Sequence, residues 1–395
     1  MKVEKGIGAR VEAGRRGADV RGDLWAAFEL AESGGLEIEL RSRLEVLYGD
    51  ATRALLLSCL EEAGIEHGRL EVEDRGAYPF LVRARMEALL RRLPGREGLR
   101  LRPEPALGPP MAPPERARRR RSRLYLPGNE AKYQLNAAIH RPDAVILDLE
   151  DSVAPAAKHD ARSVVRHALH TLDWGSCERM VRINPGAEGL EDLAVLADAP
   201  FHLVLLPKVE SAEEVRVAEA AVAGRELLFM PILETARGVL CAEEIAAASP
   251  RNVALTLGLE DLTADLGVVK TRDGEETRWA CSRVVLAARA HGLQAIDSVY
   301  GDVADEDGLR ESTRRARAMG FEGKGCVHPR QIRVIHEELR PGEAELEKAR
   351  RIVAAFEEAE ARGLGVVALG SKMVDPPVVK RALRMVAEAA EEEQG

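Results

Sequence analysis

Short apolar runs recur along the sequence after residue 120, and segments long enough for helices separate them. Near-continuous apolar runs of this length are typical of strands that are buried on both faces, as parallel strands are. The eight runs are Arg123–Gly128, Ala144–Asp151, Met180–Pro185, Leu203–Lys208, Leu227–Glu234, Val253–Asp261, Gln294–Asp297 and Gly323–His328. Eight strands that alternate with helices predict an α/β protein, a (β/α)8 TIM barrel, whose catalytic groups lie at the C-terminal strand ends.

The first 92 residues follow a different pattern, and we expect a small α+β domain over residues 1–92. Apolar and polar residues alternate over Leu36–Leu40 and again over Arg69–Glu73, as they do in half-buried strands. Apolar residues with helical spacing occupy Ala51–Ala63, and Leu81–Leu93 has the pattern of a basic amphipathic helix. This region shows no residue cluster that could catalyse a reaction by itself.

Prolines separate this region from the predicted barrel. Seven prolines lie within residues 93–118, so we expect an extended, semi-rigid linker there. The barrel is expected over residues 119–335, and residues 336–395 should form a C-terminal helical lid or oligomerisation segment. Within that segment, Gly363–Ser371 is predicted to be a flexible apolar connection, and Pro376 to open the last helix.

Composition narrows the classes of partner. The 395 residues carry a net charge of −9 and only 4% aromatics, which disfavours nucleic-acid binding; the basic run Arg116–Arg123 is interpreted as a solvated linker end or a polyanion contact. The five cysteines are widely spaced and form no Cys-x-x-Cys pair, which indicates free thiols in a reducing compartment. With no apolar signal core and no membrane-length run, we expect a cytoplasmic protein that binds neither nucleic acid nor membrane.

Two acidic residues close neighbouring strands of the predicted barrel. Glu234 ends the fifth strand and Asp261 the sixth, so both carboxylates should project into the same mouth. Two carboxylates without a nearby histidine or cysteine make an oxygen-rich site that suits Mg²⁺. The alternative is that both are surface acids at the start of helices, where acidic residues are favoured.

Basic residues should surround the same mouth. Arg182 ends the third strand and could bind a carboxylate with both of its terminal nitrogens, or it could form a structural ion pair with Asp148 or Glu150. Further cations are expected at the mouth and in the first helix, namely Lys208, Arg121 and Lys132. Such a ring of cations indicates an anionic substrate.

Other candidate chemistry is weaker. Asp297 and His328 close the seventh and eighth strands, and we expect both to be structural rather than catalytic. The sequence shows no Gly-x-Gly-x-x-Gly after a strand, no phosphate-binding loop and no Gly-x-Ser-x-Gly elbow. Dehydrogenase, nucleoside-triphosphatase and serine-hydrolase functions therefore lack support.

Motifs in the barrel region occur in the order found in a known family. They are Arg121–Asn129, Ile146–Val153, Val181–Asn184, Leu206–Glu210, Ile232–Thr235, Gly258–Asp261, Ala295–Asp297, Gly323–Lys324, His328–Pro329 and Gly370–Asp375. Together they resemble the citrate lyase β-subunit and malyl-CoA lyase family of HpcH/HpaI aldolases, which act on acyl thioesters. The resemblance implies the barrel fold and an assembly of homotrimers or pairs of trimers.

The resemblance also implies roles for single residues. Glu234 and Asp261 match the Mg²⁺ ligands of the family, and Glu234 also lies against the substrate. Arg182 matches the arginine that binds the oxo or carboxylate end of the substrate. Asp375 matches an acid that the C-terminal lid brings into the site of a neighbouring subunit.

Three further residues complete the expected site. Arg121 and Lys132 match groups near the acyl-thioester arm and are expected to bind substrate. Glu150, within the motif Ile146–Val153, is placed with Arg182 and Asp375 among the catalytic candidates.

Residues 1–92 resemble the citrate lyase γ-subunit, a small acyl carrier protein, through Tyr48–Ala51, Leu70–Ala77 and Leu81–Leu89. In that family a serine that carries the prosthetic group precedes a Gly-Asp pair. Here Arg21 precedes Gly22 and Asp23, and the nearest serine is Ser33. We therefore expect no attachment of the phosphoribosyl-dephospho-CoA arm. A citrate lyase α-subunit remains a candidate partner.

The reaction that the resemblance implies is the reversible cleavage of a β-hydroxyacyl thioester to an acetyl thioester and a 2-oxo acid. The acid would be oxaloacetate, glyoxylate or pyruvate, and the thioester would be carried by CoA or by an acyl carrier protein. Two other hypotheses stay open at this point. One is a non-catalytic scaffold subunit of a citrate-lyase-like complex, and the other is a Mg²⁺ barrel enzyme that acts on phosphoenolpyruvate.

Overall fold

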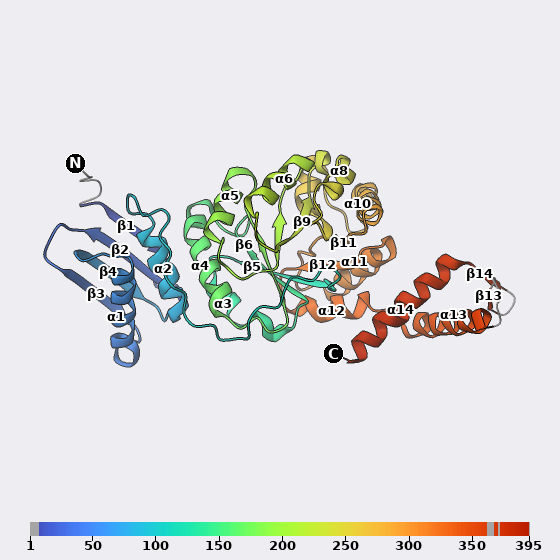
Figure 1. The fold of residues 1–395 in the computed structure, drawn as a ribbon, viewed down its shortest axis with the longest axis horizontal. Coiled ribbons are helices and arrows are strands. Elements are labelled where there is room, and N and C mark those ends of the chain that lie inside the picture. Colours follow the sequence, from blue (N-terminus) through green and yellow to red (C-terminus); the bar gives the residue numbers. More distant parts are fainter. Residues whose placement is uncertain (1–7, 362–366, 370–371, 395) are drawn as a thin grey trace. The chain divides into compact units, whose positions relative to one another are not determined.

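A computed structural model of the protein describes residues 8–361, 367–369 and 372–394. The chain forms two compact units, Met1–Ile332 and Arg333–Gly395. The first unit contains a small four-stranded sheet with two helices and a closed eight-stranded barrel (Figure 1). In the described residues, no helix is both long enough and apolar enough to span a membrane.

All eight predicted barrel strands are present, and each lies within one of the apolar runs or overlaps it. They are β5 (Ser122–Pro127), β6 (Ala144–Asp148), β7 (Glu178–Arg182), β8 (Leu203–Leu206), β9 (Leu228–Leu233), β10 (Ala254–Leu257), β11 (Gln294–Asp297) and β12 (Gly323–Cys326). Neighbouring strands are parallel, and the pairing of β12 with β5 closes the ring. The predicted TIM barrel is confirmed.

Helices surround the barrel strands. They are α3 (Ala131–Gln134), α4 (Lys158–Thr171), α5 (Gly186–Val195), α6 (Ala212–Ala221), α7 (Ala236–Leu240), α8 (Ala242–Ala247), α9 (Leu259–Leu266), α10 (Arg278–Ala290), α11 (Glu306–Met319) and α12 (Arg330–Leu339), with 3-10 turns at Ala137–His140, Pro155–Ala157 and Glu275–Thr277. Local capping explains where some of them begin. Ser211 and Glu214 form a reciprocal capping box at α6, and the Asp305 carboxylate accepts a hydrogen bond from the Gly308 amide at α11. The strands carry inward-facing apolar residues that fill the barrel core.

The N-terminal domain has more strands than the sequence pattern predicts. Its sheet has the order β1-β2-β4-β3, formed by β1 (Arg10–Gly14), β2 (Leu24–Leu30), β3 (Leu36–Ser42) and β4 (Gly68–Asp74). The helices α1 (Glu45–Glu62) and α2 (Pro79–Leu90) pack on this sheet. We did not predict β1 and β2. The first five residues of β2 are all buried, so β2 lacks the alternation that identifies a half-exposed strand.

The helix α2 packs against the barrel helix α4 (Figure 1), and it is more deeply buried than its basic amphipathic pattern suggested. Ten of its twelve residues are buried. Arg85 is one of them, and its guanidinium donates to both carboxylate oxygens of Asp23 at 2.9 and 2.8 Å. The charged residues Arg85 and Glu87 of α2 thus face partners inside the protein rather than solvent.

A buried ion cluster joins α2 to α4. The carboxylate of Glu87 is fully buried and accepts a hydrogen bond from Arg166 at 2.8 Å, and it lies 3.1 Å from Nε2 of His167. Burial alone would raise the pKa of Glu87, but the His167 contact and the Arg166 charge hold it below its ordinary value. A buried carboxylate of this kind is stable only with its partners in place.

The proline-rich segment between α2 and β5 has neither helix nor strand, yet the protein holds it at several points. The Leu101 amide donates to the Glu87 carboxylate at 2.8 Å, and the Leu107 amide donates to the Thr171 carbonyl at 2.8 Å. Near its end, Arg120 is buried and pairs with Glu178 at 2.7 Å. These contacts follow the chain from the N-terminal domain to the start of the barrel.

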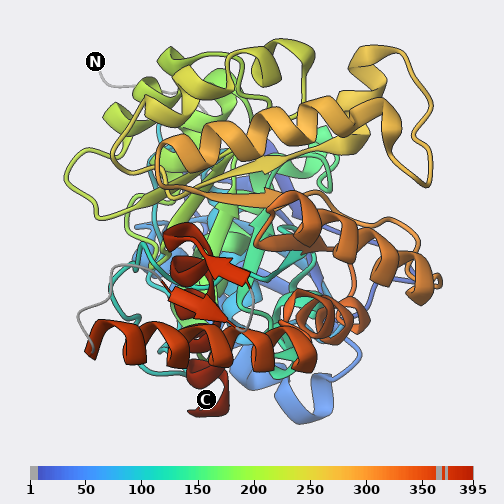
Figure 2. The ribbon, with the colours of Figure 1, turned by 90° about the vertical axis from the view of Figure 1, so that its right-hand side faces the viewer.

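The second unit contains two long helices, α13 (Glu343–Ala361) and α14 (Pro376–Gln394), which lie side by side (Figures 1 and 2). They share an apolar core that includes Ala349, Ile352 and Val379. Pro376 opens α14, as predicted. Of the connection predicted to be flexible, Val367–Leu369 (β13) pairs with Lys372–Val374 (β14), and its remaining residues lie outside the described part of the chain.

Replacing Glu87 with alanine should lower the free energy of unfolding by about 3 kcal/mol, because Arg166 and His167 would lose their buried carboxylate. Chemical denaturation followed by circular dichroism measures this change. The control is Glu71→Ala, which removes an exposed partner of Arg10 and should change stability little. Equal effects of the two substitutions would show that the buried cluster does not hold α2 against α4.

Candidate active site

A cavity of about 330 Å³ opens at the C-terminal ends of the barrel strands. Its lining includes five carboxylate residues and two arginines. The residues that line it are Arg123, Tyr125, Asp148, Asp151, Ser152, Arg182, Ile232, Glu234, Leu257, Gly258, Glu260, Asp261, Ser298, Val299 and Val327. In TIM barrels the active site lies at this end of the strands.

Glu234 is the more deeply buried of the two predicted metal ligands. It follows the last residue of β9 directly, and only 2% of it is exposed. Its Oε1 accepts a hydrogen bond from the Lys208 amide at 2.8 Å. A Cβ atom on Gly258 would lie 2.3 Å from its Oε2, so glycine at this position gives the carboxylate its room. Burial, and then the charges of Asp261 and Glu150, raise its pKa to about 8.

Asp261 lines the same cavity, but it does not end a strand as predicted. The strand β10 stops at Leu257, and Asp261 lies in the first turn of α9. The apolar pattern misled the prediction because Leu259 and Leu262 continue it into the helix. Asp261 is thus an acid in the first turn of a helix, a position where acidic residues are favoured, and it still lines the cavity and raises the pKa of Glu234.

The donor set at this end of the barrel fits a hard divalent cation. Glu234 is buried and the charge of Asp261 raises its pKa, so a cation between the two carboxylates would be stabilising. Across the described residues, no group of three or more His, Cys, Asp or Glu could hold a metal ion by itself. Two carboxylates with water or substrate in the other positions is an arrangement that suits Mg²⁺.

Arg182 occupies the last position of β7 and lines the cavity. Its guanidinium donates to both oxygens of Asp148 at 2.6 Å and lies 2.8 Å from Glu150. It also stacks over the ring of Tyr125, with 5.2 Å to the centroid. The predicted ion pair is thus present, and its carboxylates raise the pKa of Arg182 despite burial. A guanidinium has five N–H donors, so this pairing leaves donors for a ligand.

Glu150 and Lys208 form a second pair beside Arg182. Lys208 follows β8 with φ of +50°, a conformation that non-glycine residues rarely adopt and that is found at functional sites. Its Nζ pairs with Glu150 and lies 3.3 Å from Asp151. Burial raises the pKa of Glu150 although Arg182 and Lys208 oppose the shift. Glu150 thus contacts Arg182 and Lys208, but neither Glu150 nor Lys208 is among the residues that line the cavity.

Arg121 lies at the wrong end of the barrel for the role that we predicted. It precedes the first residue of β5, and its guanidinium pairs with Asp143, which precedes β6, at 2.9 Å. The N-terminal ends of the strands are opposite the cavity, so the expectation that Arg121 lines the mouth is wrong. The motif Arg121–Asn129 is present, but Arg121 precedes the strand β5 and therefore lies at its N-terminal end.

Lys132 lies in α3, after the C-terminal end of β5, and does not line the cavity. Its side chain is half exposed, 3.4 Å from Glu130 and 4.7 Å from the centroid of the Tyr133 ring. His328 is partly buried after β12, and its Nδ1 accepts a hydrogen bond from the Arg330 amide. The side chain of His328 therefore has a local structural contact.

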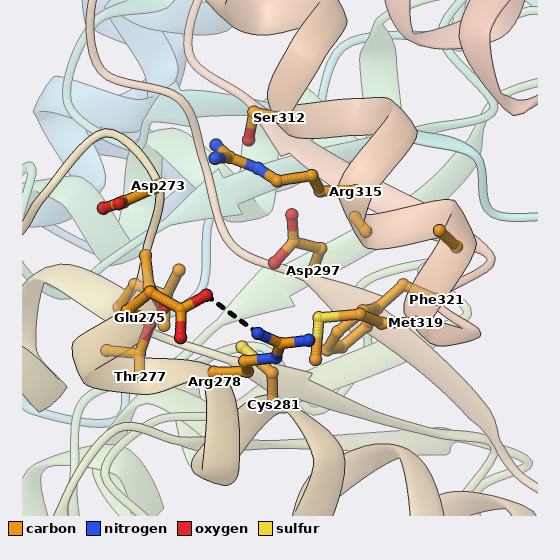
Figure 3. A pocket seen from close by; sticks show the side chains of 14 residues that line it. Asp273, Glu275, Thr277, Arg278, Cys281, Asp297, Ser312, Arg315, Met319 and Phe321 are labelled. Carbon is orange, nitrogen blue, oxygen red and sulfur yellow. Dashed lines mark hydrogen bonds and ion pairs between the residues drawn. The ribbon is translucent and has the colours of Figure 1, made fainter.

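Asp297 ends β11 as predicted, and its carboxylate pairs with the buried Lys324 of β12. It also lines a second cavity of about 320 Å³ beside α10 and α11 (Figure 3). There Arg278 pairs with Glu275, as Figure 3 shows, and Arg315 projects from α11. This cavity contains none of the predicted metal or catalytic residues, which supports a structural role for Asp297.

Asp375 belongs to the second unit, where it is exposed and stands directly before α14. Its carbonyl accepts a hydrogen bond from the Val378 amide at 2.9 Å, in the first turn of that helix. Its place before the helix agrees with the motif position, and its catalytic role remains a prediction.

The loop that would carry a prosthetic group lies in the N-terminal domain. Arg21 is exposed, Gly22 adopts φ of +64°, and Asp23 is buried by its ion pair with Arg85. Ser33 is exposed in the connection between β2 and β3. The residue that precedes the Gly-Asp pair is thus accessible, but it is an arginine.

Arg123 and Tyr125, both on β5, are among the cavity residues that the sequence did not single out. They stand in a run with Leu124 and Leu126, and we interpreted this run as an apolar strand. Alternation along the strand would have placed Arg123 and Tyr125 on one face together.

Comparison with known proteins identifies relatives of both parts of the chain. Residues 121–329 match the family model described as HpcH/HpaI aldolase/citrate lyase, and residues 14–93 match an acyl carrier model described as malonate decarboxylase delta subunit. The citrate lyase subunit beta of Leuconostoc mesenteroides subsp. cremoris is 37% identical, over 68% of this chain and 93% of that protein. A (3S)-malyl-CoA thioesterase of Cereibacter sphaeroides is 39% identical, over 68% of this chain and 94% of that protein.

Solved structures give the same result. The protein CitE of Mycobacterium tuberculosis, in complex with magnesium, acetoacetate and coenzyme A, superposes with a TM-score of 0.60. It is 38% identical, and the match covers 70% of this chain and all of that one. A citrate lyase beta subunit from M. tuberculosis, complexed with oxaloacetate and magnesium, matches at 39% identity and a TM-score of 0.51, over 57% of this chain and 99% of that one.

Glu234→Gln should weaken the binding of a divalent cation by more than about 100-fold. Mutating a residue that only supports a metal ligand lowers metal affinity by up to about 100-fold. Electron paramagnetic resonance of added Mn²⁺ measures binding without any assay of activity. The fold should persist, because glutamine has nearly the same shape as glutamate and adds no charge to a buried position. The control Asp151→Asn changes a more exposed carboxylate of the same cavity and should bind the ion nearly as well as the wild type. Unchanged binding by Glu234→Gln would remove this residue from the metal site.

Proposed function

The chain belongs to the HpcH/HpaI aldolase/citrate lyase family and is a carbon–carbon lyase, and we propose that it cleaves a β-hydroxyacyl thioester to an acetyl thioester and a 2-oxo acid. The observation that carries this proposal is the cavity in which Glu234 and Asp261 lie together with Arg182. A metal site beside a fixed guanidinium suits a substrate with a carboxylate next to a carbonyl or hydroxyl. A scaffold subunit would have no need of such a site.

We infer Mg²⁺ as the cofactor. Glu234 and Asp261 would hold the ion, and structures of relatives contain magnesium together with acetoacetate, pyruvate or oxaloacetate. When bound, the ion acts as a Lewis acid that polarises the carbonyl of the 2-oxo acid. The Lys208 amide fixes the orientation of Glu234, and Gly258 leaves the space that its carboxylate occupies.

Arg182 would bind the oxo acid end of the substrate. Asp148 holds it through two hydrogen bonds, so little rearrangement is needed as charge develops on the substrate oxygen. The stack on Tyr125 limits its movement further. We therefore expect Arg182 to stabilise the transition state more than the ground state.

Two proton transfers complete the cleavage. Glu150 would accept the proton of the β-hydroxyl group, and its raised pKa makes it a better base than an exposed carboxylate. The electrons of the broken C–C bond pass to the acetyl thioester as an enolate. Asp375 would donate a proton to the enolate carbon, from the C-terminal unit of a neighbouring subunit. The homotrimer, or dimer of trimers, that this requires is part of the proposal.

A thioesterase is the second candidate function, because (3S)-malyl-CoA thioesterases are as similar to this chain as citrate lyase β-subunits are. Incubation of the protein and Mg²⁺ with acetyl-CoA and each 2-oxo acid, followed by mass spectrometry, distinguishes the two. A lyase should give the adduct thioester with CoA still attached. A thioesterase forms no C–C bond, so it should give no adduct from acetyl-CoA and should instead hydrolyse added malyl-CoA to malate and free CoA. No adduct with oxaloacetate, pyruvate or glyoxylate would contradict the proposal, as would full activity in EDTA.

The assembly can be tested by mixing inactive subunits. Asp375→Ala and Arg182→Ala should each abolish turnover, and mixed oligomers should recover part of it, since some sites would combine an intact Arg182 with an intact Asp375. Steady-state assays after subunit exchange measure the recovery, with each variant alone as the control. No recovery in oligomers that have verifiably mixed would show that Asp375 acts, if at all, on its own barrel.

We propose that the N-terminal domain does not carry the substrate. Arg21 replaces the attachment residue, and the contacts of α2 with α4 indicate a fixed docking role. Free CoA esters are then the expected substrates, and an α-subunit is a partner only through docking. Five cysteines, all unpaired in the structure, suit a reducing cytosol.

Intact-mass spectrometry of protein produced together with the prosthetic-group transferase tests this role. The wild type should show no phosphoribosyl-dephospho-CoA adduct, because no hydroxyl precedes Gly22. Arg21→Ser restores the hydroxyl and is the matched positive control. An adduct on the wild type that maps to Ser33 would make the chain its own carrier. Removal of residues 1–115 is a poor test, because it would uncover Arg166 and His167 on α4.

A further inference from the structure

Arg123 is a buried cation in the same cavity, and none of the roles expected from the sequence was assigned to it. It lies on β5, one inward-facing position before Tyr125, so by the rise of a strand its Cα is about 7 Å deeper in the barrel. Only 1% of the residue is exposed. Its partners in the strand register are Ala144 and Gly325, whose small size leaves space for a long side chain.

The guanidinium of Arg123 has weak contacts and no carboxylate partner. One terminal nitrogen lies 3.0 Å from the sulfur of Met230, and the other lies 3.3 Å from the carbonyl oxygen of Asp297. Its Nε has no hydrogen-bond partner. Among the described residues, none of the ion pairs includes Arg123, whereas Arg182 in the same cavity has two buried carboxylates within 3 Å.

The nearest negative charge does not compensate Arg123. Asp297 acts on it electrostatically, but the carboxylate of Asp297 already pairs with Lys324. Burial lowers the pKa of Arg123, yet an arginine keeps its proton at neutral pH. A buried charge without a partner is costly, so proteins pair such groups or use them to bind a ligand of opposite charge.

We propose that Arg123 is a specificity-determining residue that binds a second carboxylate of the substrate, on the oxo acid side of the bond that is cleaved. This inference rests on the proposed function. Arg182 and the metal pair account for one carboxylate and the adjacent oxygen, which is all that glyoxylate or pyruvate offers. A 2-oxo dicarboxylic acid such as oxaloacetate brings another carboxylate, and Arg123 offers it a charge-assisted, bidentate contact at the floor of the cavity.

The test compares oxo acids that differ in the charge of their side chains. Oxaloacetate has a charged side chain, whereas the side chains of pyruvate and 2-oxobutyrate are neutral. Pyruvate is shorter than oxaloacetate, and 2-oxobutyrate has a similar length. Arg123→Met keeps an unbranched side chain beside Met230 but removes the charge. It should lower kcat/KM for oxaloacetate by roughly 100-fold, because a buried carboxylate would lose its charged partner. The value for pyruvate should change little. Arg123→Lys keeps the charge without the planar fork and should be intermediate.

Thermal unfolding without ligand separates this role from a structural one. Arg123→Met removes an uncompensated charge, so its Tm should match or exceed that of the wild type. The control Arg179→Met changes another buried arginine of the barrel, one that does not line the cavity, and should leave the preference among oxo acids unchanged. A lower Tm together with an equal loss for every oxo acid would show that Arg123 is only structural.

Ligand-induced changes in Tm, measured with Mg²⁺ and either oxaloacetate or pyruvate, keep this proposal separate from the proposed function. If no variant turns over a thioester, the lyase reaction is wrong, but selective stabilisation by oxaloacetate that Arg123→Met abolishes would still support the anion site. Equal stabilisation of the wild type and Arg123→Met by oxaloacetate would overturn it. A wild type that prefers pyruvate to oxaloacetate in both assays would overturn it as well.

Discussion

Negative charge crowded at one end of the barrel is the constraint on which the site depends. Parallel strands end together, so residues that follow β6, β9 and β10 place their carboxylates around one cavity. Burial first, and then the charges of Asp261 and Glu150, raise the pKa of Glu234. Arg182 neutralises Asp148, Lys208 neutralises Glu150, and a divalent cation would neutralise the remaining pair. Arg182 and the cation also have a use in the proposed chemistry.

The N-terminal domain follows the same electrostatic rule for a different purpose. Its helix α2 buries Arg85 against Asp23 and Glu87 against Arg166, so each charge that enters the interface has a partner. A carrier domain that delivers a substrate has to move, whereas paired buried charges favour one fixed arrangement. Both this docking and the arginine before Gly22 are consistent with a domain that no longer carries a substrate.

The sequence predicted the barrel well because apolar runs and strand ends are local features. It also identified Glu234 and Arg182, since a polar residue that closes a buried strand stands out. Asp261 was found for a partly wrong reason, because its apolar neighbours belong to a helix. The place of Arg121 was wrong because the motif spans the start of a strand, and motif matching does not show which end of the barrel a residue faces.

Arg123 and the partners of Glu87 show what a sequence cannot provide. In the sequence, Arg123 stands at the start of an apolar run and gives no sign that it lines a cavity. Its place in the cavity and the lack of a carboxylate partner can be seen only in the folded structure. The contact of α2 with α4 joins residues about 80 positions apart, and neither helix has a pattern that names the other. Residues 1–92 and 119–335 were therefore expected as separate domains without any indication of how they are held together.

Crystallography with Mn²⁺ and oxaloacetate tests the central claim most directly, because anomalous scattering locates the ion without assumptions. We expect one strong peak between the carboxylates of Glu234 and Asp261, with oxaloacetate bound to the ion and to Arg182, and its other carboxylate at Arg123. An ion held elsewhere, or one at this position with the oxo acid bound away from Arg182, would contradict the proposed site.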